Sequence, residues 1–246
     1  MDRRRRAPRP SEYGSQARVF FARWHHETIG LVINGESLFA SWDRGRSWRQ
    51  EALPGVDSIG GIDANRSSVF VVGHSRRQTD DAPVVTTKVF SSPIGRRHWK
   101  PVRGLEASSP GGLGSTLSDV AAQDKAVQVS VSTWGGTVTT WSARNGHRFV
   151  SASPCDRYAA TRVGIGAGDT RYALCSYNPD RGSIEKRVTA TTDGETYEPV
   201  AMAPKAGVTS DFASVGDTIA IGATAGDAAM LHLSVDGGRT WAKLRP

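Results

Sequence analysis

The sequence predicts an all-β protein made of five repeated units, and three observations lead to this prediction. A short turn motif recurs along the chain, alternating apolar and polar residues mark short strands, and glycine is abundant. The 246 residues include 27 glycines but only 3 methionines, which suits many strands and turns better than packed helices. A chain of this length can build one sizeable core, and all-β domains often reach it undivided.

Two stretches carry the turn motif in full. Residues 41–48 read SWDRGRSW and residues 234–241 read SVDGGRTW, so Ser, Asp, Gly and Trp recur at the same offsets. An Asp carboxylate can accept backbone N–H groups within a turn, glycine permits a positive φ, and the aromatic ring buries the turn against a neighbouring strand. The motif residues are Ser41, Asp43, Gly45, Trp48, Ser234, Asp236, Gly238 and Trp241.

Three weaker copies lie between these two. Residues 142–149 (SARNGHRF) have arginine at the Asp position, residues 91–99 (SSPIGRRHW) have proline there and one extra residue, and residues 191–197 (TTDGETY) are one residue short. The closing aromatics fall at 48, 99, 149, 197 and 241, in steps of 51, 50, 48 and 44 residues. This regular spacing indicates one structural unit per copy.

The motif resembles the Asp-box, or bacterial neuraminidase repeat, of sialidases and many other β-propellers. The resemblance implies that each copy is the hairpin between the third and fourth strands of a four-stranded antiparallel blade, away from the ligand-binding face. It implies a five-bladed propeller over residues 16–246, with residues 1–15 as a basic tail, or else five blades of a larger ring. The family includes glycosidases, receptor ectodomains and photosystem assembly factors, so the resemblance carries no single activity.

Alternation predicts four short strands in each unit, and no segment shows a helical stripe with caps. The alternation is clearest in VQVSVS and LHLSV. The predicted strands are 19–24, 29–33, 37–41 and 48–53; 58–64, 68–74, 86–91 and 99–102; 117–122, 126–133, 137–142 and 148–151; 159–165, 170–176, 186–191 and 197–200; 211–215, 218–223, 230–234 and 241–244.

Ligand-binding residues are expected on the loops opposite the turn motifs. The longest are 76–83, 103–115, 155–158 and 177–185, which belong to the second, third and fourth units and predict a binding surface there. The candidate ligand-binding residues are Arg157, Tyr158, Tyr177 and Trp134. The tryptophan fits equally well as a plug between blades.

Three aspartates recur where the innermost strands are predicted to begin: Asp57, Asp119 and Asp211. Carboxylates from different blades could act as acid and base on a glycosidic bond. Alternatively, each carboxylate satisfies backbone N–H groups at the strand entrance. We favour the second interpretation, because catalytic residues should break the symmetry of a repeat and these residues follow it.

The sequence therefore predicts a binding or scaffold propeller that recognises a glycan or a protein on its loop-rich face, with a sialidase-like glycoside hydrolase as the alternative. Sialidases carry an Arg-Ile-Pro segment before the first box, but the stretch before Ser41 offers only Arg18 and Arg23 without that tripeptide. No catalytic residue of the family can therefore be assigned. No cofactor is indicated, and the adjacent His25 and His26 would point to opposite faces of a strand, so no metal site is expected.

The net charge of +7 gives little support for nucleic-acid binding by the propeller itself. Residues 1–10 hold five arginines and one aspartate, so they supply +4 and leave only +3 for the remainder. Binding to nucleic acid or anionic lipid would rest on this tail. No apolar stretch follows the arginines to complete a signal peptide, and no run of 18 apolar residues could span a membrane.

Cys155 and Cys175 both fall in the fourth unit, one before its inner strand and the other late in the next strand. Antiparallel pairing that brings these positions together would allow a disulfide, and two buried thiols fit equally well. Because proteins with this repeat are commonly extracytoplasmic, the resemblance implies an exported protein. The sequence does not determine the oligomeric state.

Overall fold

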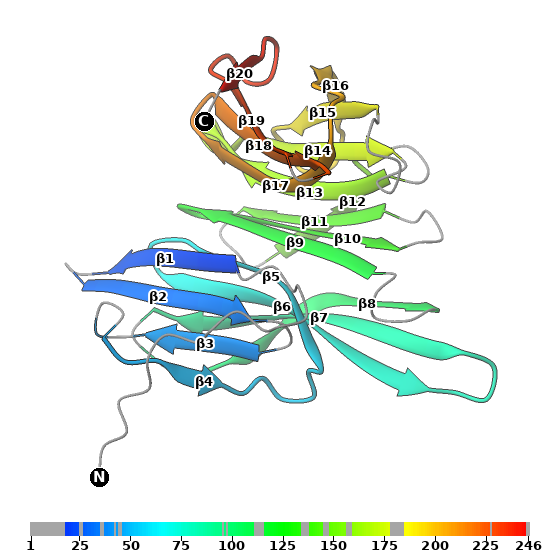
Figure 1. Cartoon of the computed structure of the whole chain (residues 1–246). Helices are drawn as coiled ribbons and strands as arrows, with labels where there is room; N and C mark the ends of the chain where they lie inside the picture. Colours follow the sequence, from blue (N-terminus) through cyan, green and yellow to red (C-terminus); the bar gives the residue numbers. More distant parts are fainter. Residues whose placement is uncertain are drawn as a thin grey trace. The chain divides into compact units, whose positions relative to one another are not determined.

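The structure is a computed structural model, and all strand and turn geometry below refers to its described residues. These are residues 18–24, 27–34, 37–41, 43, 46–94, 96, 98–110, 116–133, 138–144, 148–155, 159–177, 185–226 and 228–244. Over them, twenty strands form five four-stranded antiparallel sheets, each with its strands in sequence order (Figure 1). This confirms the predicted all-β fold of repeated four-stranded blades, which we number I to V.

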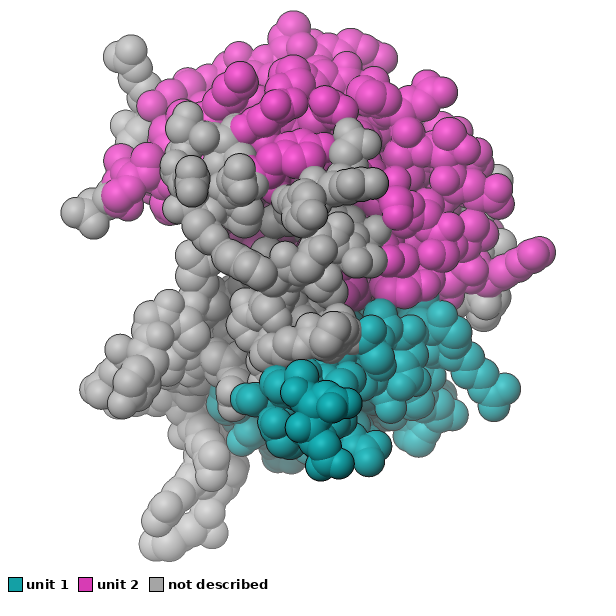
Figure 2. Space-filling model, turned by 90° about the vertical axis from the view of Figure 1, so that its right-hand side faces the viewer, with its two compact units in different colours: residues 1–113 teal, residues 114–246 magenta. Residues whose placement is uncertain are grey.

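The chain divides into two compact units, residues 1–113 with blades I and II and residues 114–246 with blades III to V (Figure 2). Blade I contains β1 (Arg18–Trp24), β2 (Glu27–Asn34), β3 (Ser37–Ser41) and β4 (Arg49–Glu51). Blade II contains β5 (Ser58–Ala64), β6 (Ser68–Gln78), β7 (Pro83–Pro93) and β8 (Lys100–Pro110).

The second unit repeats the same meander three times. Blade III contains β9 (Thr116–Gln123), β10 (Ala126–Thr133), β11 (Val138–Arg144) and β12 (Arg148–Ala152). Blade IV contains β13 (Ala159–Ile165), β14 (Arg171–Tyr177), β15 (Lys186–Thr191) and β16 (Glu198–Ala203), with the short 3₁₀ turn η2 (Ala167–Asp169) between its first two strands. Blade V contains β17 (Val208–Val215), β18 (Thr218–Ala225), β19 (Ala228–Ser234) and β20 (Ala242–Leu244).

In blades I, IV and V, the turn between the third and fourth strands is built around an aspartate. Asp43 accepts hydrogen bonds from the hydroxyls of Ser41 (3.0 Å) and Ser47 (2.6 Å) and from the Ser47 backbone N–H (2.8 Å). Asp193 and Asp236 accept a bond from the preceding Thr or Ser hydroxyl, at 2.6 and 2.7 Å, and bonds from two later backbone N–H groups each.

Hydrogen bonds that favour the ionised carboxylate lower the pKa of all three aspartates. A side-chain hydroxyl makes the largest contribution in each case, and the pKa falls to about 2 for Asp43 and to about 2 for Asp193. The pKa of Asp236 also lies well below its ordinary value, chiefly through the Thr240 hydroxyl. We call these three hairpins the carboxylate turns. Gly45 of the predicted motif lies outside the described residues.

Aromatic side chains at the ends of the turns pack between a blade and the one before it. Trp99 packs against a core that includes Leu38 from blade I and Phe90 from blade II. Within the second unit, Tyr197 packs against a core shared by blades III and IV, and Trp241 packs against a core shared by blades IV and V. The aromatic therefore joins neighbouring blades as well as burying its own turn.

The blade IV turn is fitted closely onto blade III. The Tyr197 hydroxyl accepts a hydrogen bond from the Gln128 side chain on β10 at 2.7 Å. Gly194 has a φ of +86°, and a Cβ at that position would lie 2.8 Å from the Cβ of Ser142 on β11. Only glycine suits both the left-handed backbone and this close approach.

The blade II turn requires a correction to its predicted register. Ser92, rather than the predicted Ser91, organises the turn: its hydroxyl donates to the Arg96 carbonyl and accepts from the His98 backbone N–H at 3.1 Å. Ser91 pairs instead within the β7–β8 ladder. Counted from Ser92, Trp99 falls seven residues later, as in the complete motif copies, so no residue is inserted before the aromatic.

An apolar residue fills the Asp position of the blade II turn in this corrected register. Ile94 is only 1% exposed, belongs to the core of the first unit, and donates its backbone N–H to the Ser67 carbonyl at 2.9 Å. Burial of a side chain therefore stabilises this turn, whereas a carboxylate stabilises the turns of blades I, IV and V.

Blade II is also longer than the sequence predicts. Its strands β6, β7 and β8 span 11 residues each, so 76–78, 83–85 and 103–110 are strand, although we predicted loops there. The β6–β7 hairpin continues beyond the last β5 pair, Ser58 with His74 (Figure 1). The valines and threonines at 84–87 favour an extended backbone, which gives both neighbouring strands a pairing partner.

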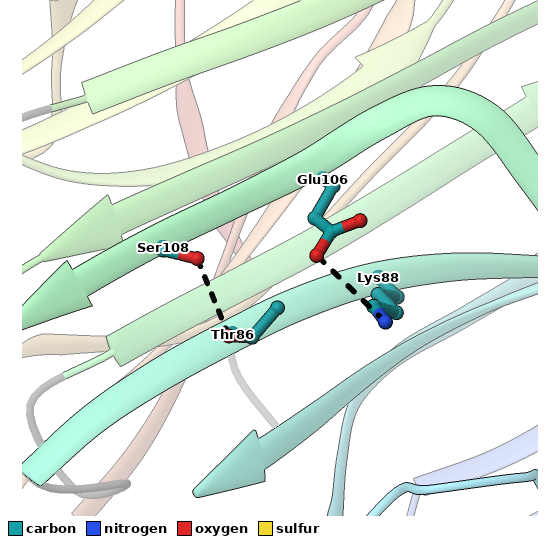
Figure 3. A network of polar contacts seen from close by, with 4 residues as sticks. All are labelled: Thr86, Lys88, Glu106 and Ser108. Carbon is teal, nitrogen blue, oxygen red and sulfur yellow. Dashed lines mark hydrogen bonds and ion pairs between the residues drawn. The ribbon is translucent and has the colours of Figure 1, made fainter. Parts of the chain in front are cut away.

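We call residues 75–78, 83–88 and 106–110 the blade II extension. On one face of it, Thr86 lies opposite Ser108 with their hydroxyls 3.2 Å apart, and Lys88 lies opposite Glu106 with an N–O distance of 3.7 Å (Figure 3). Val85 and the intervening Thr87 are both buried on the other face. This alternation gives the extension one polar, exposed face, and cross-strand pairs of this kind stabilise a sheet modestly.

Candidate functional site

Asp57 lies immediately before β5 and is bonded to β6 from both its backbone and its side chain. Its N–H donates to the His74 carbonyl at 2.7 Å, and its carboxylate accepts the Arg76 backbone N–H at 2.7 Å. These bonds hold the start of the innermost strand against β6 at the point where the blade II extension begins.

Asp119 connects two blades of the second unit. It is the fourth residue of β9 and only 8% exposed, and its carboxylate accepts the Val163 backbone N–H of β13 at 3.1 Å. The acceptor therefore comes from blade III and the donor from blade IV. A buried, charge-assisted hydrogen bond of this kind fixes the relative position of two inner strands.

Asp211 is exposed and accepts the N–H of its own neighbour, Phe212, at 2.9 Å. It is the fourth residue of β17, next to a register shift between Thr209 and Asp211. Asp211 does not stand at the strand entrance as predicted, because β17 begins three residues earlier than the alternation indicated. Asp119 lies one position further into its strand than predicted, because β9 begins at Thr116. Each of the three nominated aspartates accepts at least one backbone N–H group.

A disulfide joins Cys155, just before β13, to Cys175 on β14. Cys175 is fully buried, and Tyr177 packs against this small cluster. The Tyr177 N–H donates to the Glu185 carbonyl at 3.1 Å, which closes the base of the segment between β14 and β15. Of the two alternatives that the sequence left open, the structure contains the disulfide rather than free thiols.

Tyr177 is the one predicted ligand residue that the structure describes. The other three candidates, Arg157, Tyr158 and Trp134, lie outside the described residues. The adjacent histidines at 25 and 26 do so as well. The assignment of ligand-binding residues therefore stays a prediction.

A buried lysine clamps the connection between blades IV and V, and sequence reasoning missed it. Lys186, the first residue of β15, has no exposed surface, and its ammonium group lies 2.7–3.2 Å from the carbonyl oxygens of residues 204–207. An ammonium has three N–H donors, so four carbonyls share them. Burial lowers the pKa of Lys186, while the carbonyl oxygens stabilise the charged form.

The sequence could have indicated this clamp through the position of the lysine in its predicted strand. Lys186 and Val188 lie two residues apart and are both buried, so the lysine occupies the inward face of β15. The partner segment also requires glycine at its end, because Gly207 has a φ of +76° and an added Cβ would lie 2.8 Å from the Thr224 carbonyl oxygen. The clamp holds the 204–207 connection in one shape.

Within the described residues, no group of three or more His, Cys, Asp or Glu side chains is arranged to hold a metal ion. None of the helical segments in that part of the chain is long and apolar enough to cross a membrane.

No protein-family model matches the chain, and no curated protein does. Among solved structures, the chain is similar to the α-L-arabinofuranosidase Arb93A from Fusarium graminearum, at 12% identity and a TM-score of 0.58, over 92% of this chain and 79% of that one. It is similar to the six-bladed, fucose-recognising lectin from the fungus Aleuria aurantia, at 13% identity and a TM-score of 0.54, over 92% and 76%.

A Trypanosoma rangeli sialidase variant with trans-sialidase activity also matches, at 11% identity and a TM-score of 0.54. The match covers 96% of this chain but only 50% of the sialidase, so this chain spans about half of that enzyme's length. Identities this low establish a shared fold and do not transfer a function. The five four-stranded blades and these similarities together identify the architecture as a β-propeller.

Proposed function

We propose that this chain is a carbohydrate-binding propeller with Asp-box repeats, which recognises a glycan on its loop-rich face without hydrolysing it. The observation that carries the proposal is the use made of Asp57, Asp119 and Asp211, each of which accepts a backbone N–H group. Most glycosidases use two carboxyl groups about 5–10 Å apart that exchange protons with substrate or water, although sialidases replace one of them with a tyrosine nucleophile. Carboxylates that support the backbone are poorly suited to this role.

The structural similarities support a sugar as the ligand. One similar protein is a lectin that recognises fucose, and two others are named as enzymes acting on arabinofuranosides and sialosides. Sugar recognition on this fold therefore occurs with and without catalysis. Tyr177 stands at the base of a long connection of blade IV, and we keep it with Arg157, Tyr158 and Trp134 as the proposed ligand-binding residues.

The disulfide supports the further proposal that the protein works outside the cytoplasm, where disulfides form and persist. Labelling of cells with a membrane-impermeant thiol reagent, before and after reduction, tests this. We expect labelling of Cys155 and Cys175 only after reduction, and labelling without it would contradict the proposal.

A glycan array probed with the fluorescently labelled, oxidised protein tests the binding function. The same preparation is assayed with 4-methylumbelliferyl sialoside and arabinofuranoside. We expect selective binding to a small set of glycans and no release of the fluorophore. Arg157→Ala and Tyr177→Phe should weaken that binding, whereas Arg239→Ala, on an exposed residue of the blade V turn, should leave it unchanged.

The hydrolase alternative makes the opposite prediction. Turnover of either substrate that disappears in Asp57→Asn, Asp119→Asn or Asp211→Asn, with the fold preserved by circular dichroism, would overturn the proposal. An array without any binding would also contradict it and would favour a protein ligand.

A further inference from the structure

A hollow of about 650 Å³ lies at the end of blade II that carries the β7–β8 turn. The register of the sheet assembles it from three adjacent strands, since Ser68 of β6 lies opposite Pro93 of β7 and Ser91 of β7 lies opposite Lys100 of β8. The hollow is lined by Ser68, Ser91, Pro93, Arg96, His98 and Lys100. It belongs to the end of blade II opposite the β6–β7 connection.

The local structure explains why cationic side chains gather there. Trp99 packs into the core between blades I and II, so its two neighbours in the chain, His98 and Lys100, are directed to the other side and line the hollow. Ser92, which is 2% exposed, donates to the Arg96 carbonyl and accepts from the His98 backbone N–H, which holds these two residues in the turn. The positions of the cationic residues are therefore set by a buried framework.

The carboxylate that organises the turns of blades I, IV and V is missing here. Ile94 occupies its place, and none of the described residues that line the hollow is acidic. In the described part of the chain, no carboxylate lies within ion-pair distance of Arg96, His98 or Lys100. The turn carries an aspartate in blades I, IV and V. In blade II, the corresponding turn borders a concave surface with positive charge and two serine hydroxyls.

We propose that this hollow binds the carboxylate or sulfate group of an acidic polysaccharide. A guanidinium group can hold either oxyanion through two parallel hydrogen bonds, a lysine adds a point charge, and serine hydroxyls complete the coordination. The volume lies within the range of small-molecule sites, so it accommodates a sugar unit with its charged substituent. Clusters of basic residues are the usual feature of surfaces that bind sulfated polysaccharides.

Two other anionic ligands fit the hollow less well. Single-stranded nucleic acid is held by stacking of bases on aromatic side chains, and none of the lining residues that the structure describes is aromatic. A phosphopeptide would gain little from apolar anchoring, because Pro93 is the one apolar residue among the described lining residues. The choice of a sugar over other anions rests on the proposed carbohydrate-binding function, whereas the choice of an anion rests on the hollow alone.

The test uses the full chain in a background that removes the arginine tail as a competing anion site, with Arg3, Arg4, Arg5, Arg6 and Arg9 changed to Gln. Calorimetric titrations with a heparin hexasaccharide and with hexagalacturonate separate sulfate from carboxylate recognition. Maltohexaose serves as the neutral sugar. A phosphoserine peptide and a six-residue oligothymidylate test the other two ligand classes.

We expect at least one of the two acidic hexasaccharides to bind and maltohexaose not to bind at this site. The pair Arg96→Ala and Lys100→Ala should weaken acidic-sugar binding about tenfold or more at 0.15 M salt, and Arg96→Lys should weaken it less. The matched control pair, Arg239→Ala and Lys243→Ala, removes the same charge at the same spacing from exposed residues of blade V that do not line the hollow. It should change the affinity less than twofold.

If both double variants weaken acidic-sugar binding equally, net charge alone explains the loss and the proposal is overturned. An unchanged affinity in both double variants would overturn it as well. Tighter binding of the phosphopeptide or the oligothymidylate than of either acidic sugar would overturn the sugar assignment. Binding of neutral glycans on the array does not depend on the hollow. The array could therefore show no binding while the pair Arg96→Ala and Lys100→Ala still weakens binding of an acidic hexasaccharide. That result would contradict the proposed glycan binding on the loop-rich face but would support an anion site in the hollow.

Discussion

The turns of blade II and blade V both begin with a serine and end with a tryptophan seven residues later, but different chemistry stabilises them. In blade V, Asp236 accepts hydrogen bonds from the Ser234 hydroxyl and from two backbone N–H groups. In blade II, the serine remains as Ser92, but Ile94 replaces the carboxylate and is buried in the core. A hydroxyl at the start and an aromatic at the end are common to both. The fold thus tolerates the loss of the turn aspartate when a buried apolar side chain takes its place. The surface of that turn can then carry basic instead of acidic side chains.

The aromatic should contribute most to the stability of both turns. We expect Trp99→Ala and Trp241→Ala to lower the free energy of unfolding by about 3–4 kcal/mol each, measured by urea denaturation, because each ring packs against the core of its own unit. Both indole N–H groups are buried without a hydrogen-bond partner in the described part of the chain. Trp→Phe at either position should therefore lower the free energy of unfolding clearly less than Trp→Ala does. If Trp99→Ala lowers the free energy of unfolding only slightly while Trp241→Ala lowers it by the expected amount, the aromatic does not play the same part in the two turns.

Restoring the acid to blade II should destabilise it. Ile94→Asp places a carboxylate at a position that is 1% exposed, and we expect a loss of about 3 kcal/mol. Ile94→Val, the control, should cost about 1 kcal/mol. Unchanged stability in Ile94→Asp would mean that the blade II turn can adopt the arrangement of blade V, and that burial is not what holds it.

Blade II should also respond to acid through a buried imidazole. Burial lowers the pKa of His74 from 6.5 to about 4, and its ring lies 2.9 Å from the Thr87 hydroxyl. The unfolded chain binds the proton more readily, so stability is full above pH 6.5 and falls by about 3 kcal/mol as the pH drops to about 4. His74→Asn should flatten this part of the profile of urea midpoint against pH, and a slope that persists would contradict the assignment.

The carboxylate turns should respond at lower pH. The pKa values of Asp43 and Asp193 are lowered from 3.8 to about 2, so their contribution is present above about pH 4 and is lost as the pH falls to about 2. We expect the triple variant Asp43→Asn, Asp193→Asn and Asp236→Asn to be less stable than the parent at pH 5. The difference should narrow at pH 2.5, and a constant difference would argue against ionisation as its cause.

The smallest effect on stability is expected at the surface of the blade II hollow. Arg96 and Lys100 are exposed, so the Ala pair should change the free energy of unfolding by less than about 0.5 kcal/mol. Thermal denaturation of the parent and the pair measures this. A larger loss would mean that these side chains stabilise the turn of blade II, and any loss of anion binding would then need a variant that leaves the fold intact.

The strands were predictable because alternation and turn chemistry are properties of short stretches of chain. All twenty strands of the described residues overlap their predicted positions, and the aspartates of the carboxylate turns accept the backbone N–H groups expected of them. The errors concern ends and registers. The blade II strands extend because they pair with one another, and Ser92 organises its turn because the following Ile94 reaches the core.

The candidate site was less predictable, because its geometry depends on partners that are distant in sequence. Asp119 meets an N–H 44 residues later, and Lys186 meets carbonyls 18–21 residues later in the connection to the next blade. Neither pairing follows from local pattern. The residue types around Cys155 and Cys175 suggested two outcomes, and only the pairing of β13 with β14 decided for the disulfide.

By itself, the sequence determined that this chain is built from repeated four-stranded units closed by an aromatic, since period-two alternation and turn residues act over a few positions. The tertiary structure decided which polar groups meet, namely the lysine with its four carbonyls, the aspartate with the next blade, and an arginine, a lysine and a histidine around one hollow. The physical reason is that side-chain partners are fixed by register and blade-to-blade packing, and these depend on the whole of each compact unit.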